Sequence, residues 1–211
     1  MITSKRQLNR YCREVSALDP IMNTLVERYG YCSFSPWKND PYSQLIGSIV
    51  SQQLSVKAAN TIFSRVKDAT AVDDLIDPQK LLSLSTDELR SCGLSRGKTT
   101  YVIGISEAVI NQQLDFKKLK KLQTEQVIEE LVKLKGIGVW TAEMFSMFSL
   151  GHPDIFAVDD LGIKKGIQKL LGLNELPDKE TMLKRAEIWQ PYRSIASWYL
   201  WRIVEDKDYR F

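Results

Sequence analysis

The chain has 211 residues, of which 44% are hydrophobic and 26% charged, and it contains 11 glycines, 7 prolines and 3 cysteines. This composition is typical of a globular protein with a well-buried core, in one domain or two small lobes. No apolar run approaches the roughly 18 residues of a membrane span, and the polar N-terminus lacks the pattern of a secretory signal. We therefore expect no association with a membrane.

The cysteines and the histidine exclude several kinds of site. Cys12, Cys32 and Cys92 are odd in number and widely spaced, which argues against a disulfide scaffold and for a reducing compartment. There is no C-x-x-C pair, and His152 is the single histidine, so zinc sites and cysteine-bound iron–sulfur clusters are excluded. We expect an intracellular protein, in the nucleus if eukaryotic and the cytoplasm if bacterial, whose chemistry is carried by carboxylates.

The charges are nearly balanced but unevenly placed. The net charge is +3, from 29 Lys and Arg against 26 Asp and Glu. Residues 90–98 hold three basic side chains and no acid, and residues 117–135 hold six lysines against three glutamates. Basic residues around glycine-containing loops suit a phosphate-binding surface, while a solvated helix face is the alternative interpretation.

Signals for helix starts and stops recur along the chain. Caps or capping boxes that predict starts are Asp19-Pro20, Asp40-Pro41, Ser55, Ser85 with Glu88, Ser95 or Arg96, Thr124 and Asp159-Asp160. Gly30, Gly93 and Gly136 predict stops, and apolar residues predict a buried helix over 139–150 and a last helix after Pro191. We find no strand hairpin, so the sequence predicts an all-α fold of about ten helices.

The segment Leu134–Ala142 is the strongest local feature. One helix ends at Gly136, a tight turn follows, and a second helix begins directly after Gly138. Glycines there allow positive φ and the close approach of another backbone. The first turn of the second helix presents N–H groups suited to a phosphodiester, which gives sequence-independent DNA binding. A plain corner between two helices is the alternative.

A pair of carboxylates follows about twenty residues downstream. Asp159 and Asp160 come after the apolar segment Phe156–Val158 and open a helix. Taken alone they are an ordinary helix cap with a neighbour. Together with the Gly-Ile-Gly hairpin they form a recognisable pair.

With these motifs the sequence resembles the helix-hairpin-helix (HhH-GPD) DNA glycosylases, and within them the 3-methyladenine DNA glycosylase II branch. The resemblance covers residues 41 to about 205 through four segments in order, IVSQQLS (49–55), GIGVWTAEM (136–144), FAVDDLGIKKGI (156–167) and WQPYRS (189–194) leading to Trp201. It implies an all-α fold of two helical lobes around a DNA-binding cleft. Residues 43–150, with the hairpin 134–142, would form one lobe, and residues 1–42 with 151–211 the other.

The resemblance also implies roles for individual residues. Asp160 matches the catalytic aspartate, with Asp159 as the fallback assignment. Trp140 stands where bifunctional relatives carry a lysine nucleophile, which implies a monofunctional enzyme without lyase activity. Trp140, Met144 and Trp201 would line the pocket for the extruded base.

Further residues would contact the DNA. The backbone would be held by the hairpin and by a second, degenerate hairpin at 93–99, through Lys135, Gly136, Ile137, Gly138, Thr141, Ser95 and Lys98. Gln53 or Leu54 would fill the gap left in the duplex. The carbonyls of Val132, Leu134 and Ile137 would hold a Na⁺ or K⁺ ion, and no other cofactor is implied.

The implied function is that of a monomeric enzyme of base excision repair that acts on double-stranded DNA. It would flip an alkylated purine, such as 3-methyladenine or 7-methylguanine, out of the duplex and hydrolyse its N-glycosidic bond, leaving an abasic site. A protein of the same fold that binds lesions or abasic sites without useful excision is the main alternative. A plain helical interaction module is a third.

Overall fold

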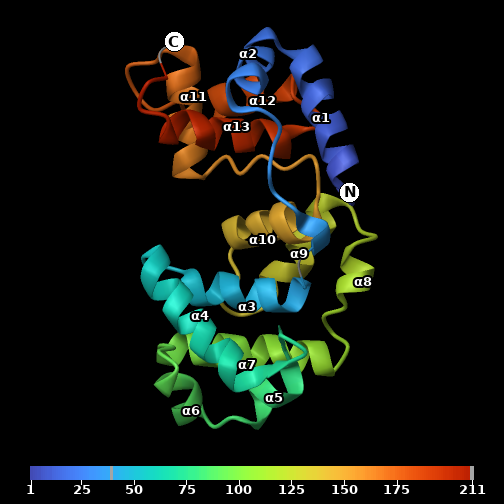
Figure 1. Cartoon of the computed structure of the whole chain (residues 1–211), viewed down its shortest axis with the longest axis vertical. Coiled ribbons are helices and arrows are strands. Elements are labelled where there is room, and N and C mark those ends of the chain that lie inside the picture. The colour runs from blue at the N-terminus through green and yellow to red at the C-terminus, as the bar shows by residue number, and fades with distance from the viewer. Residues whose placement is uncertain (39, 210–211) are drawn as a thin grey trace. The chain divides into compact units, whose positions relative to one another are not determined.

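The computed structural model describes residues 1–38 and 40–209, and these are mostly helical (Figure 1). Thirteen α-helices and one very short two-stranded sheet occur within the described residues, so the all-α class is confirmed. The chain divides into two compact units. Unit 1 comprises Met1–Trp37 and the chain from Ser146 onward, and unit 2 comprises Lys38–Phe145. No described helix has both the length and the apolar character that crossing a bilayer requires.

Unit 1 is built around its last helix. Its elements are α1 (Lys5–Leu18), α2 (Pro20–Tyr29), a π-helical turn η2 (Ser146–Leu150), α11 (Leu161–Leu171), α12 (Lys179–Glu187) and α13 (Arg193–Glu205). In Figure 1, α13 runs beside α11, and it also packs against α1 and α2. A Cβ at Gly166 would lie 2.7 Å from Leu200 Cβ, so α11 approaches α13 as closely as a glycine allows.

Unit 2 is a bundle whose centre is formed by α3 and α7. Its elements are α3 (Pro41–Ser51), α4 (Val56–Thr70), β1 (Ala71–Val72), β2 (Leu75–Ile76), α5 (Pro78–Ser83), α6 (Thr86–Ser91), α7 (Arg96–Ile110), α8 (Phe116–Leu119), α9 (Thr124–Val132) and α10 (Val139–Phe145). A three-residue 3₁₀ turn, η1 (Pro36–Lys38), lies where the two units meet in the sequence. Four apolar side chains of α3 are fully buried: Leu45, Ile46, Ile49 and Val50.

Most caps expected from the sequence start the helices; at α9 the N-cap is Gln123, one residue before the expected Thr124. Asp19 Oδ1 accepts a hydrogen bond from Ile21 N at 3.0 Å at the start of α2, and Ser85 forms a complete capping box with Glu88 on α6. Each side-chain acceptor satisfies a backbone N–H that has no partner within its helix. Gly30 closes α2 with a φ of 71°.

Three expectations were wrong. The helix expected to end at Gly136 ends at Val132, where Lys133 is the C-cap of α9. The strands β1 and β2 pair in an antiparallel hairpin, with Ala71 opposite Ile76, although no hairpin was expected. Its two turn residues, Asp73 and Asp74, both have positive φ, as the tight turns that match strand twist require. The buried helix expected over 139–150 remains α-helical only as far as Phe145 and then widens into the π-helical turn η2.

Candidate DNA-binding hairpin and catalytic carboxylate

The hairpin of unit 2 joins α9 to α10 through a turn whose geometry depends on Gly136. Gly136 has a φ of 93°, and a Cβ there would overlap the ring of Tyr101 on α7. Both facts make glycine necessary at this position. Ile137 is buried and anchors the turn, and its N–H donates to Leu134 O at 3.1 Å.

Gly138 differs from Gly136. It is not among the positive-φ glycines, and no atom lies within 4 Å of the position that a Cβ would occupy. The backbone there is therefore open on the side where other residues carry a side chain. The first hydrogen bond of α10 runs from Ala142 N to Gly138 O at 3.0 Å. The N–H groups of Gly138 and Val139 lie before this bond and so have no acceptor within the helix.

The side chains of the hairpin fall into two groups. Lys135 and Trp140 are exposed, Trp140 at 48% of its surface, and Met144 is half-buried one turn beyond Trp140 on α10. Thr141 is buried instead, with Oγ1 3.5 Å from Gln52 Nε2. Thr141 therefore packs inside unit 2, while Trp140 presents its ring at the surface.

Residues 52–54 form the turn between α3 and α4, as expected from the sequence. Gln53 adopts a φ of 56°, uncommon for a residue other than glycine, and its side chain is exposed. Leu54 leaves 40% of its surface exposed. The two residues expected to enter the duplex thus lie at the tip of a tight turn.

The second, degenerate hairpin exists as a helix–turn–helix between α6 and α7. Gly93 has a φ of 109°, and Ser95 caps α7 by accepting a hydrogen bond from Lys98 N at 3.3 Å. The ammonium of Lys98 points inward, because Nζ donates to the carbonyls of Val50 at 2.8 Å and Gln52 at 2.7 Å. The phosphate contacts expected for Ser95 and Lys98 stay predictions.

In unit 1, Asp160 is the N-cap of α11. Its Oδ1 accepts a hydrogen bond from Ile163 N at 2.8 Å and a second one from the indole Nε1 of Trp201 at 2.9 Å. Trp201 lies on α13, so its indole fixes the carboxylate from a second helix. Asp160 is half-buried in this arrangement.

Gly162 makes this arrangement possible. A Cβ at position 162 would lie 2.7 Å from Trp201 Cδ1, 2.8 Å from its Nε1 and 3.0 Å from Asp160 Oδ1. One sign of this was visible in the sequence, namely a glycine inside the first turn of a helix, where it costs stability relative to alanine. Its partner was not predictable.

The neighbouring carboxylate is placed differently. Asp159 leaves 77% of its side chain exposed, and its nearest cation is Lys164, with Nζ 3.8 Å from Oδ1. It does not cap α11. The two adjacent aspartates thus differ in burial and in the groups that hold them.

An aromatic row extends from Trp201 within unit 1. The ring centroid of Phe148, on η2, lies 5.7 Å from that of Trp201, and the centroid of Phe34 lies 5.6 Å from that of Phe148. All three residues are half-buried. We define them as the aromatic row; the sequence interpretation included only Trp201.

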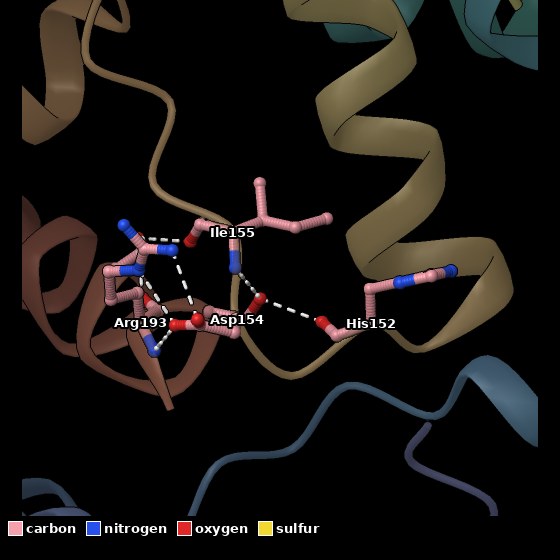
Figure 2. Close-up of polar contacts among 6 residues, drawn as sticks. His152, Asp154, Ile155 and Arg193 are labelled. Carbon is pink, nitrogen blue, oxygen red and sulfur yellow. Dashed lines mark hydrogen bonds and ion pairs between the residues drawn. The ribbon is translucent and has the colours of Figure 1, made fainter. Parts of the chain in front are cut away.

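The loop that leads to Asp160 is fastened to the start of α13 (Figure 2). Arg193 binds the carboxylate of Asp154 with two guanidinium nitrogens, Nε at 2.7 Å and Nη2 at 3.0 Å. Ser194 Oγ donates to His152 O at 2.7 Å and accepts from Ile155 N at 3.0 Å. A two-point guanidinium–carboxylate pair is geometrically specific, so this clamp holds the loop in one path.

Three carbonyls were expected to hold a monovalent cation. Val132 is the last residue of α9, and Leu134 and Ile137 belong to the turn that follows. The carbonyl of Leu134 accepts from Ile137 N at 3.1 Å, and a carbonyl oxygen has a second lone pair. Carbonyl oxygens are ligands that suit a hard cation, so the chemistry of these three groups fits a bound Na⁺ or K⁺ ion.

A glycine-hinged hairpin with an exposed tryptophan, and a capped carboxylate held by an indole, are the features that the sequence resemblance led us to expect in this helical protein. Residues 46–191 match the family described as HhH-GPD superfamily base excision DNA repair protein. The chain belongs to this superfamily.

Individual relatives match nearly the whole chain. It is 37% identical over 198 residues to DNA-3-methyladenine glycosylase 1 of Schizosaccharomyces pombe, covering 92% of this chain and 87% of that protein. It is 34% identical to the alkylbase DNA glycosidase-like protein mag2 of the same yeast, covering 90% and 91%. A solved structure of the S. pombe 3-methyladenine DNA glycosylase Mag1 in complex with abasic DNA superimposes with a TM-score of 0.82 at 35% identity, covering 96% of this chain and all of that one.

Proposed function

We propose that this protein is a monofunctional DNA glycosylase that removes alkylated purines, of the 3-methyladenine and 7-methylguanine type, from double-stranded DNA. The observation that carries the proposal is the position of Asp160, whose Oδ1 is held by Ile163 N and by the indole of Trp201. The substrate class is supported by the similarity to proteins named DNA-3-methyladenine glycosylase 1 and alkylbase DNA glycosidase-like protein mag2.

The chemistry requires the base to leave the duplex first. A stacked and paired base cannot be attacked, so it is flipped out at a cost of roughly a few kcal/mol. An alkylated purine of this type is cationic, and a cation over an indole gains about 0.5–2 kcal/mol. Trp140, Met144 and Trp201 are the side chains that we propose contact the base. The aromatic row offers further ring surface beside Asp160.

The cationic base is already a good leaving group, so it departs without a general acid. Breaking the bond develops positive charge on the sugar, as in other glycoside hydrolyses. The carboxylate of Asp160 stabilises this charge and activates the attacking water. Asp159 is less suited, because it is exposed and does not share the indole contact. Trp140 has no amine, so no Schiff base forms there and an abasic site remains.

The hairpin grips the DNA backbone in this proposal. A phosphate approaches the N–H groups at the start of α10, next to the open side of Gly138. Lys135, exposed beside the turn, adds a positive charge. Such contacts bind any sequence and make affinity depend on salt.

The duplex wedge and a bound cation complete the proposal. Gln53 and Leu54, at the tip of the turn after α3, fill the space that the flipped nucleotide leaves. The carbonyls of Val132, Leu134 and Ile137 would hold a Na⁺ or K⁺ ion, which would add positive charge near the bound phosphate.

The test is single-turnover release of 3-methyladenine or 7-methylguanine from methylated duplex DNA. Asp160→Asn should lower the rate about 10²-fold or more, while Asp159→Asn, the matched control, stays near wild type. The reverse ranking would move the catalytic role to Asp159. A wild-type protein that releases nothing but binds abasic duplex tightly would instead be a lesion-binding protein, and the enzymatic proposal would be wrong.

A further inference from the structure

The turn that carries the wedge residues is bonded to the phosphate-binding hairpin. Gln52, its first residue, uses its side-chain amide: Nε2 donates to Gly136 O at 3.0 Å and lies 3.5 Å from Thr141 Oγ1. Gly136 is the hinge of the hairpin, and Thr141 lies in the first turn of α10. One side chain therefore joins two segments that are 84 residues apart in the sequence.

Lys98 fastens the other side of the same turn. From the first turn of α7, its ammonium donates to Val50 O at 2.8 Å and to Gln52 O at 2.7 Å. These carbonyls stand at the end of α3, where helical carbonyls lack partners within the helix and favour a positive charge. The side chain is half-buried, and its burial lowers the pKa of the ammonium.

We define Gln52 and Lys98 as the latch. Together they connect the start of α7, the turn at 52–54 and the hairpin, all within unit 2. Hydrogen bonds from a charged donor are stronger than those between neutral groups, and they hold a geometry more firmly. The positive φ of Gln53 is a strained conformation that persists only where its surroundings impose it.

We propose that Gln52 and Lys98 are positioning residues, which fix the wedge residues Gln53 and Leu54 at a set place relative to the phosphate grip of the hairpin. The inference rests on the proposed function, because it assigns the latch to the wedge and to the hairpin of that function. Its physical basis is that a wedge enters the duplex productively only when the phosphate beside it is held at a fixed distance. Lys98 then acts through carbonyls of its own chain, not as a ligand of phosphate.

A phosphate contact and a positioning role for Lys98 predict different results in DNA-binding measurements. A lysine that contacts phosphate weakens binding to every duplex alike when it is removed, and it lowers the slope of log affinity against log salt by about one. A lysine that positions the wedge leaves the slope unchanged and lowers the preference for a duplex with a gap to fill. The preference is the ratio of affinities for a duplex with a tetrahydrofuran abasic analogue and for the undamaged duplex.

The experiment measures both affinities at several salt concentrations for wild type and Lys98→Met. We expect the preference to fall about tenfold, with the slope unchanged. Lys179→Met, an exposed lysine on α12, is the matched control and should retain the preference. In a Leu54→Ala background, Lys98→Met should change the preference little, because two residues that act through one wedge are not additive.

Gln52→Ala provides the same test should Lys98→Met fail to fold, with the exposed Gln44→Ala on α3 as its control. A slope reduced by one with an unchanged preference would overturn the proposal, as would a full effect of Lys98→Met in the Leu54→Ala background. A wild-type protein without preference for the abasic duplex would also overturn it. A wild-type protein that prefers the abasic duplex but releases no base would contradict the proposed excision and leave the role of Gln52 and Lys98 standing.

Discussion

Replacing Gly162 with alanine tests whether the contact between Trp201 and Asp160 sets the rate. The new Cβ would lie 2.7 Å from Trp201 Cδ1 and 3.0 Å from Asp160 Oδ1, both shorter than the 3.4 Å at which ordinary contact begins. The indole must therefore move by about 0.7 Å, and it takes with it the N–H that holds the carboxylate. The substitution adds no charge and removes no polar group.

The magnitude follows from this displacement. A misplacement of about 1 Å at a reacting group costs roughly 10²-fold in rate, so we expect release of 3-methyladenine to be about 10- to 100-fold slower. Overpacking lowers the free energy of unfolding by about 1–3 kcal/mol. The higher helix propensity of alanine than of glycine offsets about 0.5–1 kcal/mol of this loss. The net loss of unfolding free energy should be about 0–2.5 kcal/mol, which leaves the protein folded.

The assay is single-turnover base release, with urea unfolding of the same samples. Gly104→Ala in α7 is the matched control, because no atom lies within 4 Å of a Cβ there; it should keep the wild-type rate. In a Trp201→Ala background, Gly162→Ala should cost less than in wild type, since the displaced ring is gone and the 3.0 Å approach to Asp160 Oδ1 is what remains. A Gly162→Ala protein that releases base within twofold of wild type would refute the reasoning.

Three other predictions concern stability and DNA affinity. Hydrogen bonds from the Tyr29 hydroxyl and the Asp208 backbone, with Arg28, lower the pKa of Asp206 to about 2. Because the pKa is lower in the folded state, this stabilisation is present above about pH 4 and is lost as the pH falls towards 2. The free energy of urea unfolding of Asp206→Asn should therefore depend less on pH in that range than that of wild type. Gly136→Ala should lower the unfolding free energy by at least about 2 kcal/mol, because of its positive φ and the overlap with Tyr101; an unchanged urea midpoint would contradict this. Affinity for undamaged duplex should fall linearly with log salt, and a flat dependence in a filter-binding titration would exclude the phosphate grip.

The helices were largely predictable because their start signals are local. A capping side chain bonds to an N–H two or three residues further along the same chain, so the pattern at Asp19, Ser55 or Ser85 is visible without a fold. The hairpin β1–β2 was missed because its strands are two residues long and its turn is Asp-Asp, without the glycine that normally marks such turns. The end of α10 was missed because an all-round apolar segment does not distinguish an α-helix from a π-helical turn.

The contacts of the site could not be predicted in the same way. The bond from Trp201 to Asp160 spans 41 residues and that from Gln52 to Gly136 spans 84. Glutamine and lysine are common surface residues, and nothing in the neighbouring sequence marks Gln52 and Lys98 as half-buried donors to backbone carbonyls. Their roles depend on which helices pack together, and that is a property of the fold.

Trp201 illustrates how the structure adds to a predicted role. The family resemblance implied a flat wall for the flipped base, which uses a face of the indole. The hydrogen bond to Asp160 uses the N–H, which lies in the plane of the ring and at its edge. Because an edge and a face are separate surfaces, one indole can hold the carboxylate and still offer a face to a cationic base. Phenylalanine would keep the face and lose the N–H, so the hydrogen bond to Asp160 requires a tryptophan where the proposed contact with the base requires only an aromatic ring.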